Sequence, residues 1–309
     1  MPFFSVCIPL YNKANFIAKT LQSVVDQNFK NFEILICDDG STDHSVAKVN
    51  KFKDERIKLI QQDNQGAASA RNKTIQASSG EYIAFLDADD LWQKNHLNTL
   101  HQLICDYWQA KLFATNYKIQ SLNGKHRLPF FSHQLKTGFV DDYFFESLSD
   151  PVMTCFNSAV HHSVFKEIGY FNSDYRTGQD VDFAIKANLN FRLAYHEEPT
   201  VIYHQTTENN LAKTQFNQDR LAYIQAYDDL AKKHKSLAHY LAVNRFALIL
   251  KSKQAGDDVW KEAKKGLDVS CLNKKQKILL KCSGNQLRLL KKAQLLLSES
   301  GLYLSPFKN

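Results

Sequence analysis

The chain has 309 residues and a net charge of +7, and its 44% hydrophobic and 23% charged residues are typical of a globular protein with a sizeable core. No apolar run approaches the roughly 18 residues of a membrane span, which disfavours an integral membrane synthase, and the first residues lack the basic stretch of a secretory signal. Six scattered cysteines without a Cys-x-x-Cys pair suit a reducing compartment, so we expect a cytoplasmic protein.

Strand and helix patterns alternate over the first ninety residues. Apolar runs predict strands at residues 4–10, 32–37, 56–61 and 82–86. Helical spacing or an alanine-rich composition predicts helices over residues 14–27, after Asp43, and over residues 67–77. Because strands and helices alternate at short intervals, the sequence predicts an α/β fold with a mostly parallel, doubly wound sheet.

The middle of the chain continues this alternation less regularly. The patterns predict a helix over residues 94–108, strands over 112–120 and 152–161, a helix from 179, and extended segments at 191–195 and 200–204. Residues 121–150 are aromatic and irregular. We interpret them as a loop-rich insertion able to stack on a sugar, with an aromatic core as the alternative.

The last third of the chain differs in charge. Residues 206–309 hold 19 Lys and Arg against 9 Asp and Glu, whereas residues 1–205 hold 20 against 23. The pattern looks helical from about Asn210, and residues 272–297 place leucines among lysines. A basic amphipathic stretch predicts contact with an anionic membrane surface. The alternative is the solvated basic face of a helical bundle.

Three polar loops follow predicted strand ends, at residues 9–12, 38–40 and 87–89. In open α/β sheets the carboxyl ends of the strands meet at one edge, where ligands bind. The carboxylates Asp87, Asp89 and Asp90 repel one another unless a cation joins them. Mg²⁺ or Mn²⁺ held by one or two carboxylates and a substrate diphosphate fits this set. The alternative is a structural loop, with Asp90 capping a helix that starts near Trp92.

Five motifs in this order resemble the family-2 inverting glycosyltransferases with the GT-A fold. They are Val6–Asn12, Asp38–Asp43, Gln65–Asn72, Tyr82–Asp90 and Gly178–Asp182. The resemblance covers roughly residues 3–205. It implies a GT-A catalytic domain over residues 1–205, with a nucleotide-sugar-binding half (1–110) and an acceptor-binding half (111–205). Residues 206–309 would form a basic helical C-terminal region.

The resemblance also implies a donor site for a nucleotide-diphospho-sugar, usually a UDP-sugar. Pro9 and Tyr11 would line the nucleotide pocket, with Tyr11 against the base. Asp39 would accept a hydrogen bond from uracil, and Arg71 would approach the nucleotide or its diphosphate. Asp87 would reach the ribose or the metal shell.

Metal and catalytic roles follow from the same resemblance. Asp89 would bind Mn²⁺ or Mg²⁺ with Asp87, and His204 lies where some GT-A enzymes place a metal-binding histidine. Asp180 would be the catalytic base, because inversion needs one base and no enzymic nucleophile. Asp182 is the fallback base, and a helix cap is the alternative for Asp180. Gln179 stands where the family usually has Glu, so a second carboxylate beside the acceptor is missing.

These expectations combine into one function. The chain would move a hexose or N-acetylhexosamine from a UDP-sugar to a hydroxyl of a glycan or lipid-linked glycan in cell-surface polysaccharide synthesis. It would work in the cytoplasm or on the cytoplasmic face of the inner membrane. The alternatives are a non-catalytic nucleotide-sugar-binding module and a nucleotidyltransferase of related fold. No motif supports nucleic-acid binding.

Overall fold

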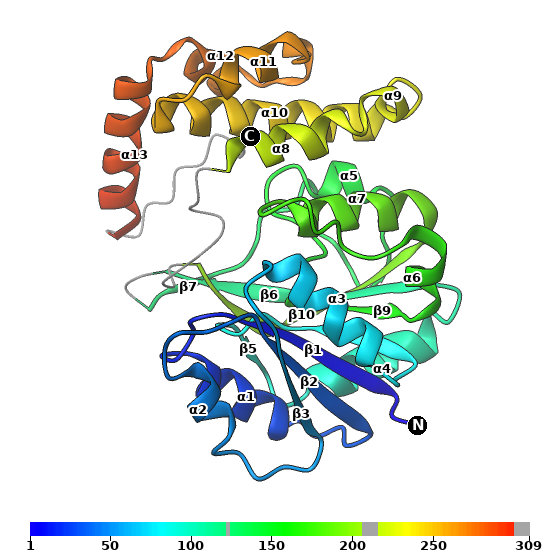
Figure 1. Ribbon diagram of the computed structural model, residues 1–309. Coiled ribbons are helices and arrows are strands. Elements are labelled where there is room, and N and C mark those ends of the chain that lie inside the picture. The colour runs from blue at the N-terminus through cyan, green and yellow to red at the C-terminus, as the bar shows by residue number, and fades with distance from the viewer. Residues whose placement is uncertain (122–123, 206–215, 300–309) are drawn as a thin grey trace. The chain divides into compact units, whose positions relative to one another are not determined.

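The computed structural model describes residues 1–121, 124–205 and 216–299, the side chains of 295–299 excepted (Figure 1). The expected start of the helical tail at Asn210 and the side chain of Leu297 lie outside these residues. The chain forms two compact units. Unit 1 comprises Met1–Pro129, Gln134–Asp141 and the described part of Val152–Leu211. Unit 2 comprises Phe130–His133, Asp142–Pro151 and the described part of Ala212–Asn309.

A mixed sheet forms the centre of unit 1. Among the described residues its main path runs β3-β2-β1-β4-β9-β6-β10-β5. The first four strands are parallel: β3 (Ile57–Gln61), β2 (Phe32–Asp38), β1 (Phe4–Leu10) and β4 (Tyr82–Phe85). The predicted mostly parallel α/β sheet is confirmed.

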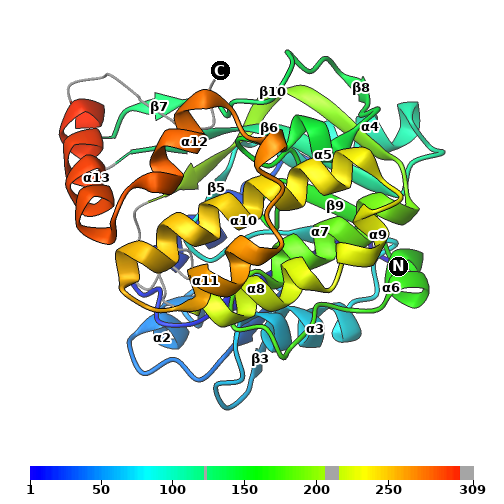
Figure 2. The same ribbon diagram turned by 90° about the horizontal axis from the view of Figure 1, so that it is seen from above.

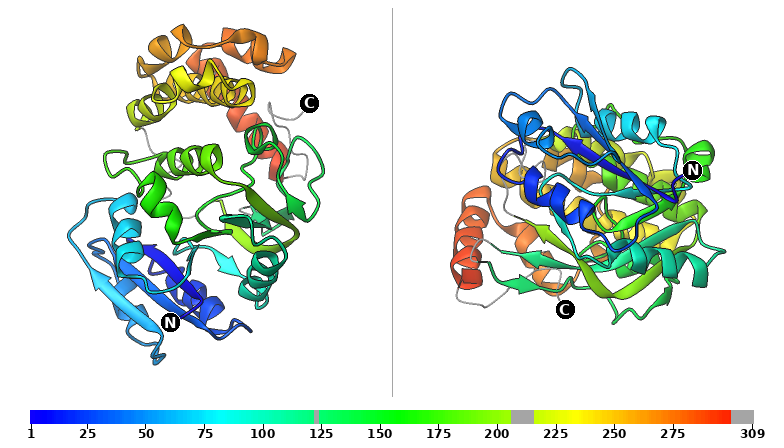
Figure 3. Two further views of the ribbon diagram at one scale, coloured as in Figure 1. Left: turned by 90° about the vertical axis from the view of Figure 1, so that its right-hand side faces the viewer. Right: turned by 90° about the horizontal axis from the view of Figure 1, so that it is seen from below.

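The second half of the sheet is mixed. Strand β9 (Ser158–His161) runs antiparallel to β4 and β6 (Leu112–Gln120), and β10 (Leu193–His204) runs parallel to β6, beside which it lies in both views of Figure 3. Three two-residue strands extend it: β5 (Leu91–Trp92) and β8 (Gly138–Phe139) on β10, and β7 (His126–Arg127) on β6.

Helices cover this sheet. They are α1 (Ile17–Val25), α2 (Ser45–Val49), α3 (Ala67–Ala77), α4 (His96–Asp106), α6 (Ser163–Ile168) and α7 (Gln179–Asn190). Helix α1 buries Ile17, Leu21 and Val24, an apolar stripe at helical spacing. Helix α3 packs on β1 and β2 and lies across them in Figure 1. This packing fixes the residues of α3 relative to the carboxyl ends of the strands.

Pro9 lies inside β1 rather than ending it. It is aligned with Cys37 of β2, and pairing between β1 and β4 stops at Cys7 and Phe85. The carbonyls of Phe3 and Cys7 face β4, so the missing N–H of Pro9 also faces that side, beyond the last pair. The strand can therefore run on to Leu10 without losing a ladder hydrogen bond.

The predicted helix start near Trp92 is wrong. Trp92 belongs to β5, paired with Val201, and α4 starts at His96 after Asn95. Asp90 therefore caps no helix. Instead its carboxylate Oδ1 accepts the backbone N–H of His204, 2.8 Å away.

Two other strand predictions need correction. The strand predicted over 152–161 covers only Ser158–His161, because Asn157 bonds back to Thr154 N at 2.8 Å and Val152 O at 3.0 Å and makes a turn. The segments 191–195 and 200–204 belong to one strand, β10, with register shifts around Pro199.

The aromatic stretch 121–150 contains short elements and core residues. Besides β7 and β8 it forms α5 (Tyr143–Glu146), whose N-cap Asp142 accepts from Phe145 N. Tyr143 and Phe144 are buried, and their rings lie 6.4 and 5.7 Å from the ring of Tyr240 in unit 2. For these two residues the aromatic-core alternative is therefore correct.

Unit 2 is built around one long helix, α10 (Lys235–Ala255), which buries Leu241, Phe246 and Ile249. The other helices of its C-terminal part are α8 (Asn217–Gln225), α9 (Asp228–Ala231), α11 (Val259–Lys265), the 3₁₀ turn Val269–Cys271, α12 (Lys274–Lys281) and α13 (Gly284–Glu299). All of them contact α10, which Figure 2 shows running through the bundle. No helix in the described ranges combines the length and apolarity needed to cross a bilayer.

A buried carboxylate ties the start of the sheet together. Glu33 of β2 accepts from Ser5 Oγ at 2.7 Å, Ser79 N at 2.7 Å and Lys58 Nζ at 2.8 Å. Burial disfavours the carboxylate, but these hydrogen bonds outweigh it and lower the pKa of Glu33 to about 2. The network joins β1, β2 and β3 to the turn between α3 and β4.

We therefore predict a pH-dependent effect of Glu33→Gln. Because folding lowers the pKa of Glu33, its carboxylate stabilises the fold fully at pH values above its ordinary pKa of 4.5. This stabilisation is lost as the pH falls through about 2. Wild type should exceed the variant in unfolding free energy by roughly 2–3 kcal/mol at neutral pH. Denaturant titrations between pH 7 and about 2 should show the difference shrinking. The exposed Glu55→Gln serves as control, and a difference constant with pH would contradict the prediction.

Candidate active site

The loops after β1 and β2 are bonded to each other. Leu10 O accepts from Asp39 N at 2.8 Å, and Asn12 N donates to Ser41 Oγ at 2.9 Å. The Asn12 side chain accepts from Thr42 N at 2.8 Å, and Asn12 itself has a φ of 49°, a left-handed value that asparagine tolerates. The two predicted loops thus meet at one edge of the sheet.

Asp39 organises the loop in front of α3. It is buried, and its carboxylate accepts from Gln62 Nε2 at 2.6 Å, Gln65 N at 2.8 Å and Gly66 N at 2.9 Å. Gly66 has a φ of 91°, which favours glycine at this turn. Sequence reasoning missed this structural role. The contact of Asp39 with uracil stays a prediction.

Arg71 of α3 is paired with Asp87 at the end of β4. Its Nη2 donates to Asp87 Oδ1 at 2.6 Å, and its side chain is only 7% exposed. Burial works against the charge of Arg71, but the sulfur of Cys155 and the carboxylates of Asp87 and Asp180 raise its pKa. The other guanidinium nitrogens, Nε and Nη1, are buried without a hydrogen-bond partner among the described residues.

Asp89 is paired with a lysine that sequence reasoning missed. Lys13 Nζ lies 2.7 Å from Asp89 Oδ2, and the two side chains are 12% and 14% exposed. Lys13 directly follows the Tyr11-Asn12 turn after β1, which was a signal that it could reach the same edge. It is 76 positions from Asp89, however, and sequence spacing gives no measure of that contact.

Asp90, the next residue after Asp89, is fully buried. Burial, together with the charges of Asp89 and Asp87, raises the pKa of Asp90 well above its ordinary value, although the His204 N–H favours the charged form. Asp90 Oδ2 and His204 Nδ1 are buried and have no hydrogen-bond partner within the described part of the chain. Burial also lowers the pKa of His204, which favours the neutral ring that binds metals.

This carboxylate cluster fits a divalent cation. No three Asp, Glu, His or Cys side chains of the described ranges can hold a metal by themselves. Mg²⁺ and Mn²⁺ are typically bound through one or two carboxylates, with phosphate oxygens and water completing the shell. Burial and the nearby Asp89 also raise the pKa of Asp87, against the opposing effect of Arg71. Ionisation of Asp87 and Asp90 is therefore disfavoured unless a further cation joins these carboxylates.

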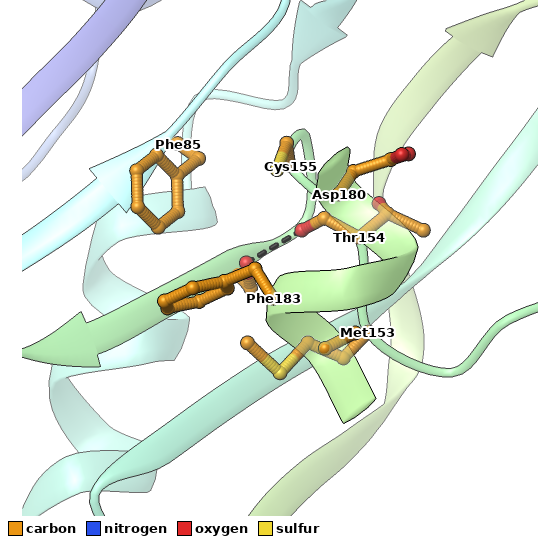
Figure 4. Close-up of a pocket in the computed structure, with 8 residues that line it drawn as sticks. Phe85, Met153, Thr154, Cys155, Asp180 and Phe183 are labelled. Carbon is orange, nitrogen blue, oxygen red and sulfur yellow. Dashed lines mark hydrogen bonds between the residues drawn. The ribbon is translucent and has the colours of Figure 1, made fainter. Parts of the chain in front are cut away.

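Asp180 lies in the first turn of α7, whose N-cap is Gly178, so the helix-cap alternative for Asp180 is wrong. Its side chain is exposed at a small pocket that also includes Phe85, Cys155 and Phe183, and Figure 4 shows the carboxylate pointing away from Phe183. The charge of Asp180 acts on both Arg71 and Asp87, so the three groups share one site.

The neighbours of Asp180 are held inside the protein. Asp182 is buried, with Lys186 Nζ 3.1 Å from its Oδ2. Gln179 is also buried, and its Oε1 has no hydrogen-bond partner in the described structure. Of the two candidate bases, Asp180 is therefore the one open to a substrate.

Pro9 and Tyr11 complete the placement of the predicted site residues. Pro9 is partly buried near the end of β1, and Tyr11 follows the strand with 41% of its surface exposed. An exposed aromatic ring beside the Asp39 loop is suited to stacking. Their contact with a nucleotide stays a prediction.

Comparison with known proteins assigns this arrangement to a family. The family model described as "Glycosyl transferase family 2" matches residues 5–169, more than half of the chain. The chain belongs to glycosyl transferase family 2. The matched residues include every loop that forms the cluster around Arg71, Asp87 and Asp89, but stop short of Asp180 and His204.

Two curated relatives of this family-2 chain are named as glycosyltransferases. The putative teichuronic acid biosynthesis glycosyltransferase TuaG of Bacillus subtilis is 33% identical over 183 residues, 58% of this chain and 69% of TuaG. The UDP-Glc:alpha-D-GlcNAc-diphosphoundecaprenol beta-1,3-glucosyltransferase WfgD of Escherichia coli is 45% identical over 94 residues, 30% of this chain and 37% of WfgD. The chain spans less than half the length of most curated relatives it matches.

The fold is shared with solved structures. S. aureus TarS 1-349, crystallised in complex with UDP-GlcNAc, superposes with a TM-score of 0.70 at 20% identity, covering 99% of this chain and 93% of that chain. At this identity the likeness shows the fold alone. The predicted GT-A fold with a helical C-terminal region is confirmed.

The crowding of carboxylates predicts the behaviour of Asp90→Asn. The amide keeps an acceptor for the His204 N–H and removes a buried acid whose ionisation the site disfavours. We expect the variant to melt several degrees above wild type in EDTA near neutral pH, and to gain less stability than wild type from Mn²⁺. Differential scanning fluorimetry measures both. Glu81→Gln, half exposed at the start of β4, is the control. A lower melting temperature than wild type in EDTA would contradict the prediction.

Proposed function

We propose that the chain is a metal-dependent inverting glycosyltransferase of cell-surface polysaccharide synthesis. It moves a hexose or N-acetylhexosamine from a UDP-sugar to a hydroxyl of a glycan or lipid-linked glycan. Support comes from WfgD, whose name includes a UDP-sugar donor and a diphosphoundecaprenol acceptor, and from the bound UDP-GlcNAc of TarS. In this proposal residues 1–205 are catalytic, 1–110 binding the donor and 111–205 the acceptor.

The observation that carries the proposal is the buried guanidinium of Arg71. Two of its nitrogens lack hydrogen-bond partners among the described residues, although burying an unpaired donor is costly. A ligand that accepts hydrogen bonds from these nitrogens would remove that cost. A diphosphate offers anionic acceptors in the bidentate geometry that arginine prefers. Asp87, one of the two carboxylates proposed to bind the metal, is paired with the same side chain at 2.6 Å.

The surrounding residues fit the remaining parts of the donor. Asp89 and Asp87, with His204 as a further ligand, would hold Mn²⁺ or Mg²⁺. The cation would neutralise charge that develops on the leaving diphosphate. Tyr11 and Pro9 would bracket the base, and Asp39 would bind uracil while it holds the loop ahead of α3.

Asp180 serves as the base in this mechanism. The acceptor oxygen forms a bond to the anomeric carbon as the bond from that carbon to the diphosphate oxygen breaks. The acceptor proton goes to the Asp180 carboxylate, and the electron pair leaves with UDP. Since Asp182 is buried against Lys186, the exposed Asp180 is the available acceptor of the proton.

A donor screen with Asp180→Asn tests this proposal. UDP-, GDP- and dTDP-sugars are incubated with Mn²⁺ and a GlcNAc-diphospho-lipid acceptor, and nucleotide release and product are measured. We expect one UDP-sugar to be used, and the variant to lose roughly 10²- to 10⁴-fold in kcat with unchanged UDP affinity. Asp174→Asn, exposed on the preceding turn, is the matched control. A variant with wild-type kcat would exclude Asp180 as base, and UDP-sugar binding without turnover would favour a binding module.

We further propose that the C-terminal region docks on the cytoplasmic leaflet, where a lipid-linked acceptor is presented. Helix α13 exposes Leu289 and Leu290 at 67% and 49%, beside the exposed Arg288, Lys291 and Lys292. Exposed leucines next to cations complement an anionic lipid surface. A solvated basic face of the bundle is the competing explanation.

Liposome flotation of full-length charge variants separates these explanations. Replacing Arg288, Lys291 and Lys292 by Gln should weaken binding to vesicles with anionic lipid by roughly 100-fold, at about 1 kcal/mol per charge. Replacing Lys261, Lys264 and Lys265 of α11 by Gln removes the same charge away from these leucines, and should change binding little. Equal flotation of wild type and the α13 variant would contradict the docking proposal.

A further inference from the structure

We propose that Lys13 is a diphosphate-binding residue that holds Asp89 until a divalent cation arrives and then moves to the donor phosphates. The starting observation is the 2.7 Å ion pair between Lys13 Nζ and Asp89 Oδ2. It engages the carboxylate that the donor metal would need. The inference rests on the proposed donor site, and it assigns a role to a residue outside the predicted set.

The backbone of Lys13 is firmly placed. Its N–H donates to Ser45 Oγ at 2.8 Å, and the next residue, Ala14, donates its N–H to Asp43 Oδ2 at 2.9 Å. These contacts, with those of Asn12, fasten the loop after β1 to the loop after β2. The ammonium can therefore change partner only by rotation of its own flexible side chain, which keeps it at this edge of the sheet.

The ion pair and a metal on Asp89 would compete for the same carboxylate. Both side chains are largely shielded from water, at 12% and 14% exposure, so screening of their charges is weak. A divalent cation on Asp89 would repel the adjacent ammonium. A bound cation would therefore favour release of the Lys13 ammonium, which in this structure is paired with Asp89.

The diphosphate is the natural destination of the displaced ammonium. A donor metal held by Asp89 would also be held by the phosphates of the substrate, which would bring phosphate oxygens close to this carboxylate. Lysine is a common phosphate ligand that acts as a mobile point charge. Arg71 and Lys13 would then hold the diphosphate from α3 and from the loop after β1.

Binding measurements on Lys13→Met test the inference without relying on turnover. In nucleotide-free protein, Mn²⁺ affinity followed by electron paramagnetic resonance should rise roughly three- to ten-fold, because the competing ammonium is gone. In the presence of Mn²⁺, UDP affinity should fall about ten-fold or more, whereas uridine affinity should not change. Lys13→Arg keeps the charge and should preserve the ratio of UDP to uridine affinity.

The outcomes separate this inference from the proposed function. Unchanged or weaker Mn²⁺ binding in Lys13→Met would overturn the competition. Equal losses of UDP and uridine affinity would make Lys13 a structural residue and overturn the phosphate contact. Absence of UDP binding in wild type would instead reject the donor site. The Mn²⁺ measurement would still decide whether Lys13 competes with the metal for Asp89. Circular dichroism confirms that both variants are folded.

Discussion

Crowded negative charge at the end of β4 is the constraint on which the site depends. Asp87, Asp89 and Asp90 lie within four positions, and burial with mutual repulsion raises the pKa of Asp87 and of Asp90. Two cationic side chains pair with this cluster. Arg71 Nη2 lies 2.6 Å from Asp87 Oδ1, and Lys13 Nζ lies 2.7 Å from Asp89 Oδ2. Among the described residues, neither Oδ2 of Asp90 nor the Nε and Nη1 atoms of Arg71 has a hydrogen-bond partner. The site thus has a carboxylate oxygen and guanidinium nitrogens that lack partners within the described residues. A metal and a diphosphate together would supply partners of both signs.

The rest of unit 1 keeps this unfavourable cluster in place. The Glu33 network joins three strands to the turn before β4, and Asp39 fixes the loop that leads into α3 and so positions Arg71. Neither carboxylate needs to touch a substrate to do this. A parallel sheet places the loop ends together, and the buried hydrogen bonds determine where each side chain lies. Preorganised charge of this kind costs no rearrangement when the leaving group becomes anionic.

Sequence reasoning predicted the parallel half of the sheet and the meeting of its loops. Both predictions rest on local signals, namely the spacing of apolar residues and the polar residues that follow each strand. It missed features set by contacts between distant residues. Trp92 pairs with β10 rather than entering a helix, and Asn157 turns the chain where apolar residues suggested a strand. Lys13 reaches Asp89 across 76 positions through a flexible side chain, which no spacing rule measures. The further role of Asp39 in holding the loop before α3 also depends on backbone N–H groups, which the sequence does not distinguish.

Calorimetric titration of UDP with and without Mn²⁺ tests the central claim most directly. If the metal and the diphosphate complete one another at the end of β4, the two ligands must be thermodynamically coupled. We expect Mn²⁺ to tighten UDP binding by about ten-fold or more, and UDP to tighten Mn²⁺ binding by the same factor. UDP binding that is equally tight in EDTA and in Mn²⁺ would contradict a shared site.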